Sequence, residues 1–256
     1  IAPSFEMALM KAVRGAEVGL DSLNRKNDPE DHAPIWERLR RVDDHRLFTI
    51  FEALKGGTSI DEIFSITRID RWFLAKLKKM AEFEKALEKD GLTVEHYETG
   101  KKMGYPDDTL KRLSGAAALP CEKKDAVYKM VDTCAAEFKA QTPYFYSTFD
   151  DENEAAEFIA EQNTGKKKVI VFGSGPIRIG QGIEFDYCCV HCVWALKEAG
   201  YEAVIANNNP ETVSTDFDTG DRLYFDPLTK EDVRSLIETE KPYGVVVQFG
   251  RQTAIK

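Results

Sequence analysis

Glycines crowd the point where a short apolar run meets a helical pattern, and this arrangement constrains the fold more than any other feature. The run spans 169–172, a second apolar run spans 203–206, and the glycines that follow the first run are Gly173, Gly175, Gly180 and Gly182. Strand, glycine-rich turn, helix and strand in this order form the βαβ unit of nucleotide-type folds. Ligands of such units bind beyond the carboxyl ends of the strands. We therefore expect functional residues within 173–182 and 207–216.

The rest of the carboxyl-terminal third continues this pattern. A helix is expected over about 184–199 and another over about 229–240, with a third strand at 244–249. Parallel strands joined by helices require right-handed crossovers that cover both faces of the sheet. The sequence from 168 onward therefore predicts a three-stranded parallel βαβαβ subdomain of Rossmann-like type.

Residues 35–115 have a different pattern, in which short amphipathic segments end at glycines. Ser59 and Glu62 have the spacing of a capping box, and Asp70 precedes a further apolar stripe as a helix cap. Trp72 is expected to anchor the core of that helix. The segment predicts an all-helical domain of short antiparallel helices, so the fold class is α + α/β.

Three other segments have weaker patterns. Residues 1–22 predict one amphipathic helix, with Phe5, Leu9, Ala12, Val13 and Ala16 on its apolar face. Residues 125–149 are aromatic and too irregular for a helix, so we expect an extended connector. Residues 150–168 are expected to form a loop. The sequence lacks an initiator Met and stops where a helix should follow a strand, so we expect a piece of a longer polypeptide.

Composition excludes several functional classes. The net charge is −9, whereas a nucleic-acid surface needs a clustered basic excess. No apolar run approaches the roughly 20 residues that span a bilayer, so no membrane segment is expected. The cysteine count is odd, which favours reduced thiols in a cytoplasmic protein over disulfides. These cysteines are Cys121, Cys134, Cys188, Cys189 and Cys192.

Several of these candidate residues fit known binding sites poorly. The glycine spacing is not that of a dinucleotide motif, and asparagines stand where NAD-binding proteins carry an acidic residue. Cys188, Cys189 and His191 are too crowded for a zinc site, so no metal is expected. The helix dipole alone accounts for Asp186, whereas Glu184 lies close enough to Gly182 to face the same cleft.

Four long motifs carry a resemblance to a known family. They are residues 69–74 (IDRWFL), 128–138 (YKMVDTCAAEF), 176–191 (PIRIGQGIEFDYCCVH) and 209–216 (NPETVSTD). With them, the whole chain resembles the large subunits of carbamoyl-phosphate synthetases. The resemblance implies that residues 1–22 are the tail of the first synthetase half. It implies a helical oligomerisation domain with its connector over 23–160 and a truncated pre-ATP-grasp subdomain over 166–256.

The family makes carbamoyl phosphate from bicarbonate, ATP and glutamine-derived ammonia, and the resemblance implies that this fragment is inactive alone. It implies a tunnel or carbamate-site wall formed by Gly182, Glu184, Arg178 and Gln181. Ligand-side loops are implied at Gly173, Gly175, Gly180, Asn207, Asn209, Glu211, Thr212, Ser214, Thr215 and Gln252. ATP, Mg²⁺ or Mn²⁺, and K⁺ belong to the full-length parent, with no cofactor in the fragment.

The implied partners are a glutaminase small subunit, the remaining ATP-grasp domains and further copies of the chain. The sequence departs from the family pattern at Ser174, Ile177 and Arg251, and Arg251 crowds a turn that the family keeps small. Two alternatives stay open: a purely structural oligomerisation module, and a nucleotide-binding Rossmann module.

Overall fold

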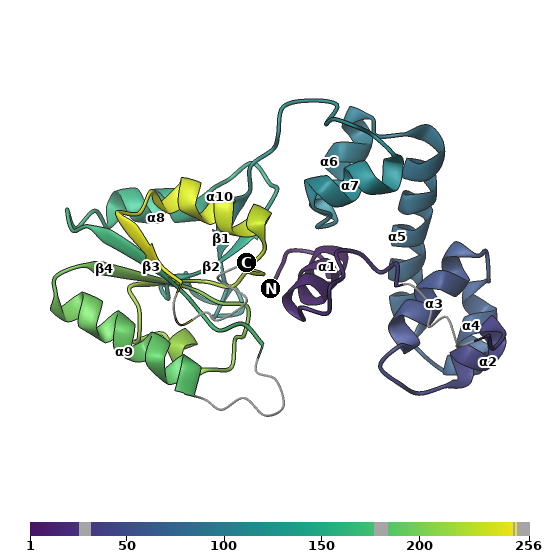
Figure 1. Ribbon diagram of the computed structural model, residues 1–256, viewed down its shortest axis with the longest axis horizontal. Coiled ribbons are helices and arrows are strands. Elements are labelled where there is room, and N and C mark those ends of the chain that lie inside the picture. Colours follow the sequence, from purple (N-terminus) through teal and green to yellow (C-terminus); the bar gives the residue numbers. More distant parts are fainter. Residues whose placement is uncertain (26–31, 177–183, 248, 250–256) are drawn as a thin grey trace. The chain divides into compact units, whose positions relative to one another are not determined.

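The computed structural model describes residues 1–25, 32–176, 184–247 and 249. The chain forms two compact units (Figure 1), which we call the helical unit and the α/β unit. The helical unit contains residues 3–14 and 18–123, and the α/β unit contains residues 1–2, 15–17 and 124–256. Residues 124–160, which we expected to belong with the helical domain, therefore pack with the sheet.

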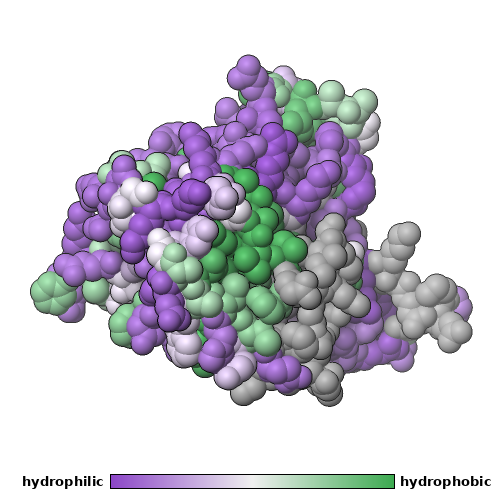
Figure 2. Space-filling model, turned by 60° about the vertical axis from the view of Figure 1, so that its left-hand side comes forward, coloured by the Kyte–Doolittle hydropathy of each residue, from purple (hydrophilic) through white to green (hydrophobic). Residues whose placement is uncertain are grey.

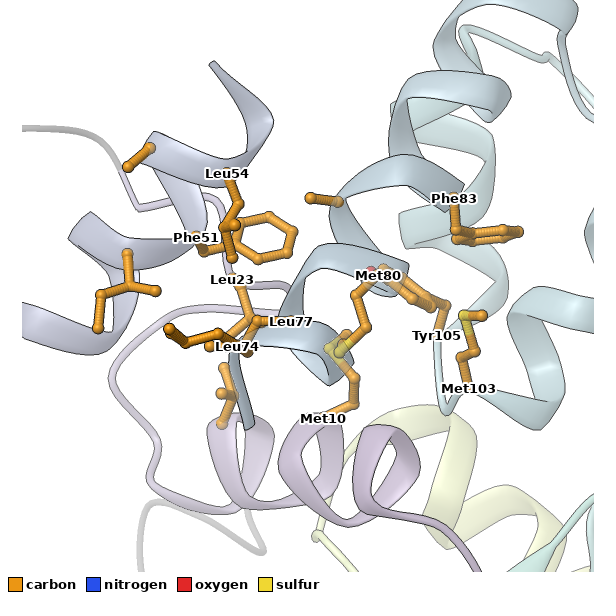
Figure 3. Close-up of a cluster of buried hydrophobic side chains, with 14 of the residues drawn as sticks. Met10, Leu23, Phe51, Leu54, Leu74, Leu77, Met80, Phe83, Met103 and Tyr105 are labelled. Atoms are coloured by element: carbon orange, nitrogen blue, oxygen red, sulfur yellow. The ribbon is translucent and has the colours of Figure 1, made fainter. Parts of the chain in front are cut away.

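The helical unit is built around one long helix. This helix is α5 (Arg71–Asp90), and the others described are α1 (Phe5–Gly15), α2 (Ile35–Arg40), α3 (Arg46–Lys55), α4 (Ile60–Thr67), α6 (Val94–Lys102) and α7 (Asp107–Ser114). Leu74, Leu77 and Met80 of α5 are at most 3% exposed and point into a core that α1 and α3 complete (Figure 3). The predicted all-helical domain is confirmed.

Helix ends in this unit follow the sequence signals. The Glu62 N–H donates to Ser59 Oγ at 3.2 Å and the Ser59 N–H donates to Glu62 Oε2 at 2.9 Å, which confirms the capping box. Asp70 Oδ1 accepts from the Trp72 N–H at 2.7 Å and caps α5. Each cap satisfies backbone donors that the first helical turn leaves free.

Two expectations for this unit were wrong. Trp72 is 53% exposed and packs its ring edge-to-face on Phe5 and Phe73 at the surface, so it does not anchor the core. Helix α1 ends at Gly15 instead of continuing to residue 22, and its buried apolar side chains are Met7, Met10 and Val13. Ala12 is exposed, because the face of α1 that packs on the core differs from the predicted apolar face.

The α/β unit contains a six-stranded sheet in the order β1-β2-β5-β4-β3-β6. The strands are β1 (Val127–Met130), β2 (Tyr144–Thr148), β3 (Lys168–Phe172), β4 (Glu202–Ala206), β5 (Arg222–Tyr224) and β6 (Gly244–Val246). All neighbours are parallel except β1 and β2. The predicted α + α/β class is confirmed, but the sheet has six strands where three were expected.

The additional strands have clear physical origins. Strands β1 and β2 lie in the aromatic segment that we interpreted as a connector. They pair with each other, and both precede the predicted βαβ pattern in the sequence. Strand β5 has only three residues, too few for a periodic pattern. Residues 150–168, expected as a loop, include α8 (Glu154–Glu161), which Asn153 caps through the Ala156 N–H.

Helices cover both faces of the sheet (Figure 1). Helices α8 and α10 (Lys230–Glu240) pack on one face, where Ile170, Val204 and Tyr224 are buried. Helix α9 (Glu184–Glu198) packs on the other, over Val171 and Ile205. Successive residues of one strand therefore enter opposite cores, as the two-residue period of a strand requires.

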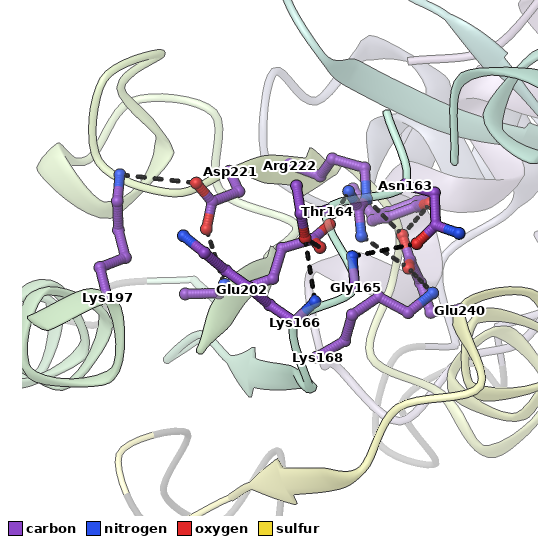
Figure 4. Close-up of polar contacts among 12 residues, drawn as sticks. Asn163, Thr164, Gly165, Lys166, Lys168, Lys197, Glu202, Asp221, Arg222 and Glu240 are labelled. Atoms are coloured by element: carbon purple, nitrogen blue, oxygen red, sulfur yellow. Dashed lines mark hydrogen bonds and ion pairs between the residues drawn. The ribbon is translucent and has the colours of Figure 1, made fainter. Parts of the chain in front are cut away.

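A buried ion network joins β5 to α10 (Figure 4). The Arg222 guanidinium is 2% exposed and donates from Nε and Nη2 to the two carboxylate oxygens of Glu240, at 2.8 and 2.9 Å. Glu202 accepts from Arg222 Nη1, and Lys168 Nζ donates to Glu240 Oε2 at 3.0 Å. The charges compensate one another, which buried charges require.

The face that Figure 2 presents is mostly hydrophilic and carries one apolar patch. Among the described residues, no helix has the length and apolar character needed to cross a membrane.

Candidate functional site

The carboxyl ends of β3 and β4 lie side by side, and this brings the two predicted loops together. Phe172 pairs with Ala206 in the parallel register, and the Gly173 N–H donates to the Ala206 carbonyl at 2.8 Å. The residues that follow, 173–176 and 207–216, therefore leave the sheet at one edge. The predicted proximity of these two loops is confirmed for the residues that the structure describes.

Asn207 fastens the two loops to each other. Its side chain is fully buried, and Oδ1 accepts from the Gly175 N–H at 3.2 Å and from the Asn209 N–H at 3.4 Å. A Cβ on Gly173 would lie 2.4 Å from Asn207 Cγ, so only glycine leaves room for this amide. Gly175 has a φ of +71°, which also favours glycine. Asn207 Nδ2 is buried and has no partner in the described part of the chain.

The loop after β4 is held by its own side chains. Asn209 Oδ1 accepts from the Glu211 N–H at 3.1 Å, and the loop then enters the short 3₁₀-helix η1 (Val213–Thr215). Thr212 Oγ1 and Ser214 Oγ lie 3.2 Å apart, and Thr215 Oγ1 donates to the Thr212 carbonyl at 2.7 Å. Hydroxyls and amides rather than charges therefore dominate this loop.

Asp186 ties this loop to helix α9. It is 5% exposed, and its Oδ2 accepts from the N–H of fully buried Ser214 at 3.0 Å. Its Oδ1 is buried without a partner among the described residues. We attributed Asp186 to the helix dipole alone, and that interpretation was incomplete. Sequence spacing contains no signal for this bond, because the two residues are 28 positions apart.

The remaining predicted residues divide into two groups. Glu184 is exposed and opens α9, so its carboxylate stands at the positive end of the helix dipole. The other group lies outside the described residues: Arg178, Gly180, Gln181, Gly182 and Gln252.

The thiols of α9 have different surroundings. Burial raises the pKa of Cys189 to about 12, and the nearby Asp186 carboxylate adds to this effect. Burial also raises the pKa of Cys192. Both shifts oppose the thiolate form that metal binding and nucleophilic attack require. Within the described ranges, no three His, Cys, Asp or Glu side chains gather into a possible metal site.

The described edge is suited to binding and orientation. It offers the half-buried hydroxyl of Thr212 and the exposed carboxylates of Glu184, Glu211 and Asp216. Neutral dipoles that are fixed by packing can orient a small polar ligand without a change of protonation.

Comparison with known proteins agrees with this architecture. Residues 1–131 match the family model described as the carbamoyl-phosphate synthetase large chain, oligomerisation domain, and residues 165–256 match the carbamoyl phosphate synthase preATP-grasp domain. The carbamoyl phosphate synthase large chain of Lachnoclostridium phytofermentans is 50% identical over 264 residues, and that of Agathobacter rectalis is 49% identical over 267 residues.

Both alignments cover 100% of this chain but only 24% of the relative, so the chain spans about a quarter of the length of these curated relatives. The resemblance found in the sequence is therefore confirmed. The chain belongs to the carbamoyl phosphate synthase large-chain family.

Proposed function

We propose that this chain is part of the large chain of a glutamine-dependent carbamoyl phosphate synthase, and that it has two tasks there. The helical unit serves as a self-association scaffold. The edge of the sheet formed by 173–176 and 207–216 is part of the wall of the second active site and of the tunnel that delivers carbamate. The observation that carries the proposal is the 50% identity to such a large chain over the whole of this one.

The geometry supports the second task. Asn207 holds the glycine-rich loop and the Asn209–Thr215 loop together, and Glu184 opens the helix that follows the glycines. In this proposal, the Glu184 carboxylate accepts hydrogen bonds from the amino group of carbamate and helps to orient it. The phosphoryl transfer itself needs a nucleotide clamp. We assign ATP, Mg²⁺ or Mn²⁺, and K⁺ to ATP-grasp domains outside this chain, and the supply of ammonia to a glutaminase subunit.

The nucleotide-binding alternative has less support. Strand β4 is followed by Asn207, whose oxygen is already used by Gly175 and Asn209, and no carboxylate stands there to bind a ribose. The purely structural alternative differs from our proposal only in the role of the sheet edge, so a test of that edge separates them.

The test is the coupling of ATP use to product in the full-length large chain with Glu184→Gln. We expect more ATP to be hydrolysed per carbamoyl phosphate formed, because carbamate that is poorly oriented escapes or decomposes. Glu198→Gln, an exposed glutamate at the other end of the same helix, is the matched control and should keep normal coupling. Unchanged coupling in Glu184→Gln would favour the purely structural alternative.

A further inference from the structure

The Asn208 side chain contacts a segment that lies outside the two loops of the candidate site. Its Nδ2 donates to the Gly15 carbonyl at 2.9 Å, across 193 positions of sequence. Residues 15–17 group with the α/β unit, so this bond joins the start of the chain to the loop after β4 within one unit. Asn208 Oδ1 is buried and has no partner in the described part of the molecule.

The contact is closely fitted on both sides. A Cβ on Gly15 would lie 3.2 Å from Asn208 Nδ2, tighter than ordinary side-chain contacts, so the amide rests directly on the glycine. A reversed amide would place Oδ1 against the Gly15 carbonyl, where two acceptors repel. The bond therefore fixes the rotation of the amide as well as the position of Asn208.

Asn208 lies between the two residues that organise the proposed site. Asn207 bonds to the loop after β3, and Asn209 bonds to the turn of its own loop at Glu211. Three consecutive asparagines thus hold this stretch of backbone: Asn207 and Asn208 bond to two other segments, and Asn209 bonds within the loop. Fixing the middle one restrains the backbone on which both neighbours depend.

We propose that Asn208 is a positioning residue, which holds the loop 207–216 against Gly15 and thereby fixes Asn207 and Asn209 at the edge of the sheet. The importance of that edge for carbamate rests on the proposed function, but the positioning itself does not. The contact needs a donor at position 208, and a Cβ at position 15 would push this donor away by a few tenths of an ångström.

Amide hydrogen exchange of this chain, followed by NMR, tests the proposal. The reporters are the N–H groups of Asn209 and Glu211, which donate to Asn207 Oδ1 and Asn209 Oδ1. Loss of one neutral hydrogen bond should accelerate their exchange about fivefold. We expect this in Asn208→Ala and a smaller acceleration in Gly15→Ala, whose Cβ displaces the amide. The double variant should show no acceleration beyond that of Asn208→Ala, because both changes act on the same contact.

Asn208→Asp separates hydrogen bonding from shape. Aspartate has nearly the same shape but cannot donate when ionised, so exchange should accelerate at least as much as in Asn208→Ala. Gly244→Ala is the matched control, because a Cβ there meets nothing within 4 Å. Unchanged exchange in Asn208→Asp, or additive effects in the double variant, would overturn the proposal.

The full-length large chain supplies the second measurement. Faster exchange together with more ATP hydrolysed per carbamoyl phosphate would support both the positioning role and the proposed function. Faster exchange with normal coupling would support the positioning role and contradict the assignment of this edge to carbamate.

Discussion

At the scale of single residues, the ion network of Arg222 links the sheet to α10. Arg222 has a bidentate partner in Glu240, and Tyr224 Oη donates to the same carboxylate at 2.6 Å. Burial alone would raise the pKa of Glu240, but the hydrogen bonds and positive charge of Arg222 lower it below its ordinary value. Burial and the Glu240 charge raise the pKa of Tyr224 well above its ordinary range.

This network predicts a defined pH dependence. A carboxyl with a lowered folded-state pKa contributes stability above its unfolded pKa, near 4.3, and that stability is lost as the pH falls through the folded pKa. Glu240→Gln should lower the free energy of unfolding at pH 7 by about 3 kcal/mol, because buried Arg222 loses its bidentate partner and keeps only Glu202 among its described partners.

Urea denaturation of both proteins from pH 7 to pH 3 measures this difference. The difference in the free energy of unfolding between the two proteins should narrow below about pH 4.5, as Glu240 of the unchanged protein becomes protonated. A gap that stays constant over this range would show that the Glu240 charge does not stabilise the fold.

The cysteines give a second prediction at this scale. Cys189 is fully buried with its pKa raised to about 12, whereas Cys121 is exposed. Iodoacetamide reacts with the thiolate, so at pH 8 it should label Cys121 readily and leave Cys189 unmodified until the protein unfolds. Peptide mass spectrometry with and without urea measures both sites. Labelling of Cys189 at the rate of Cys121 without urea would contradict the packing of α9 on the sheet.

At the scale of secondary-structure elements, local signals explain what the sequence could predict. Helices α4 and α5 begin at their predicted caps, and Gly91 ends α5, because caps act within one turn of backbone. The strands at 168–172 and 202–206 could be predicted from continuous apolar runs. Strand β5 could not, because it has only three residues, and β1 and β2 could not, because they lie in an irregular aromatic segment that we interpreted as a connector.

The capping box allows a direct measurement. Ser59→Ala should lower the free energy of unfolding by about 1 kcal/mol, because the Glu62 N–H loses its acceptor and the Ser59 hydroxyl no longer holds the Glu62 carboxylate. Ser65→Ala, an exposed serine inside the same helix, is the control and should change stability by less than about 0.5 kcal/mol. Equal effects of the two changes in urea denaturation would contradict the cap.

The candidate site shows the same division between local and distant information. The glycines and asparagines could be placed at one edge from the βαβ pattern, since parallel strands align their carboxyl ends. The roles of Asp186 and Asn208 could not, because they bond to Ser214 and Gly15 through contacts that no local pattern encodes. A local pattern can also mislead. Trp72 belongs to an apolar stripe of the sequence, yet its side chain lies at the surface.

At the scale of the whole molecule, the chain combines two units that match different family models. The helical unit corresponds to a family described as an oligomerisation domain. It also carries exposed apolar side chains, including Trp72, Phe73 and Val42, which is 82% exposed. Exposed aromatic groups of this kind are typical of protein contact surfaces. We therefore expect this chain to self-associate without the rest of the large chain.

The most direct test of the scaffold claim is the molar mass of the chain by light scattering over a concentration series, at about 0.15 M salt to screen its net charge of −9. We expect a mass that rises with concentration from 28.9 kDa toward an integer multiple of it. A mass that stays at 28.9 kDa up to the highest concentration would contradict the claim that the helical unit alone is a self-association scaffold.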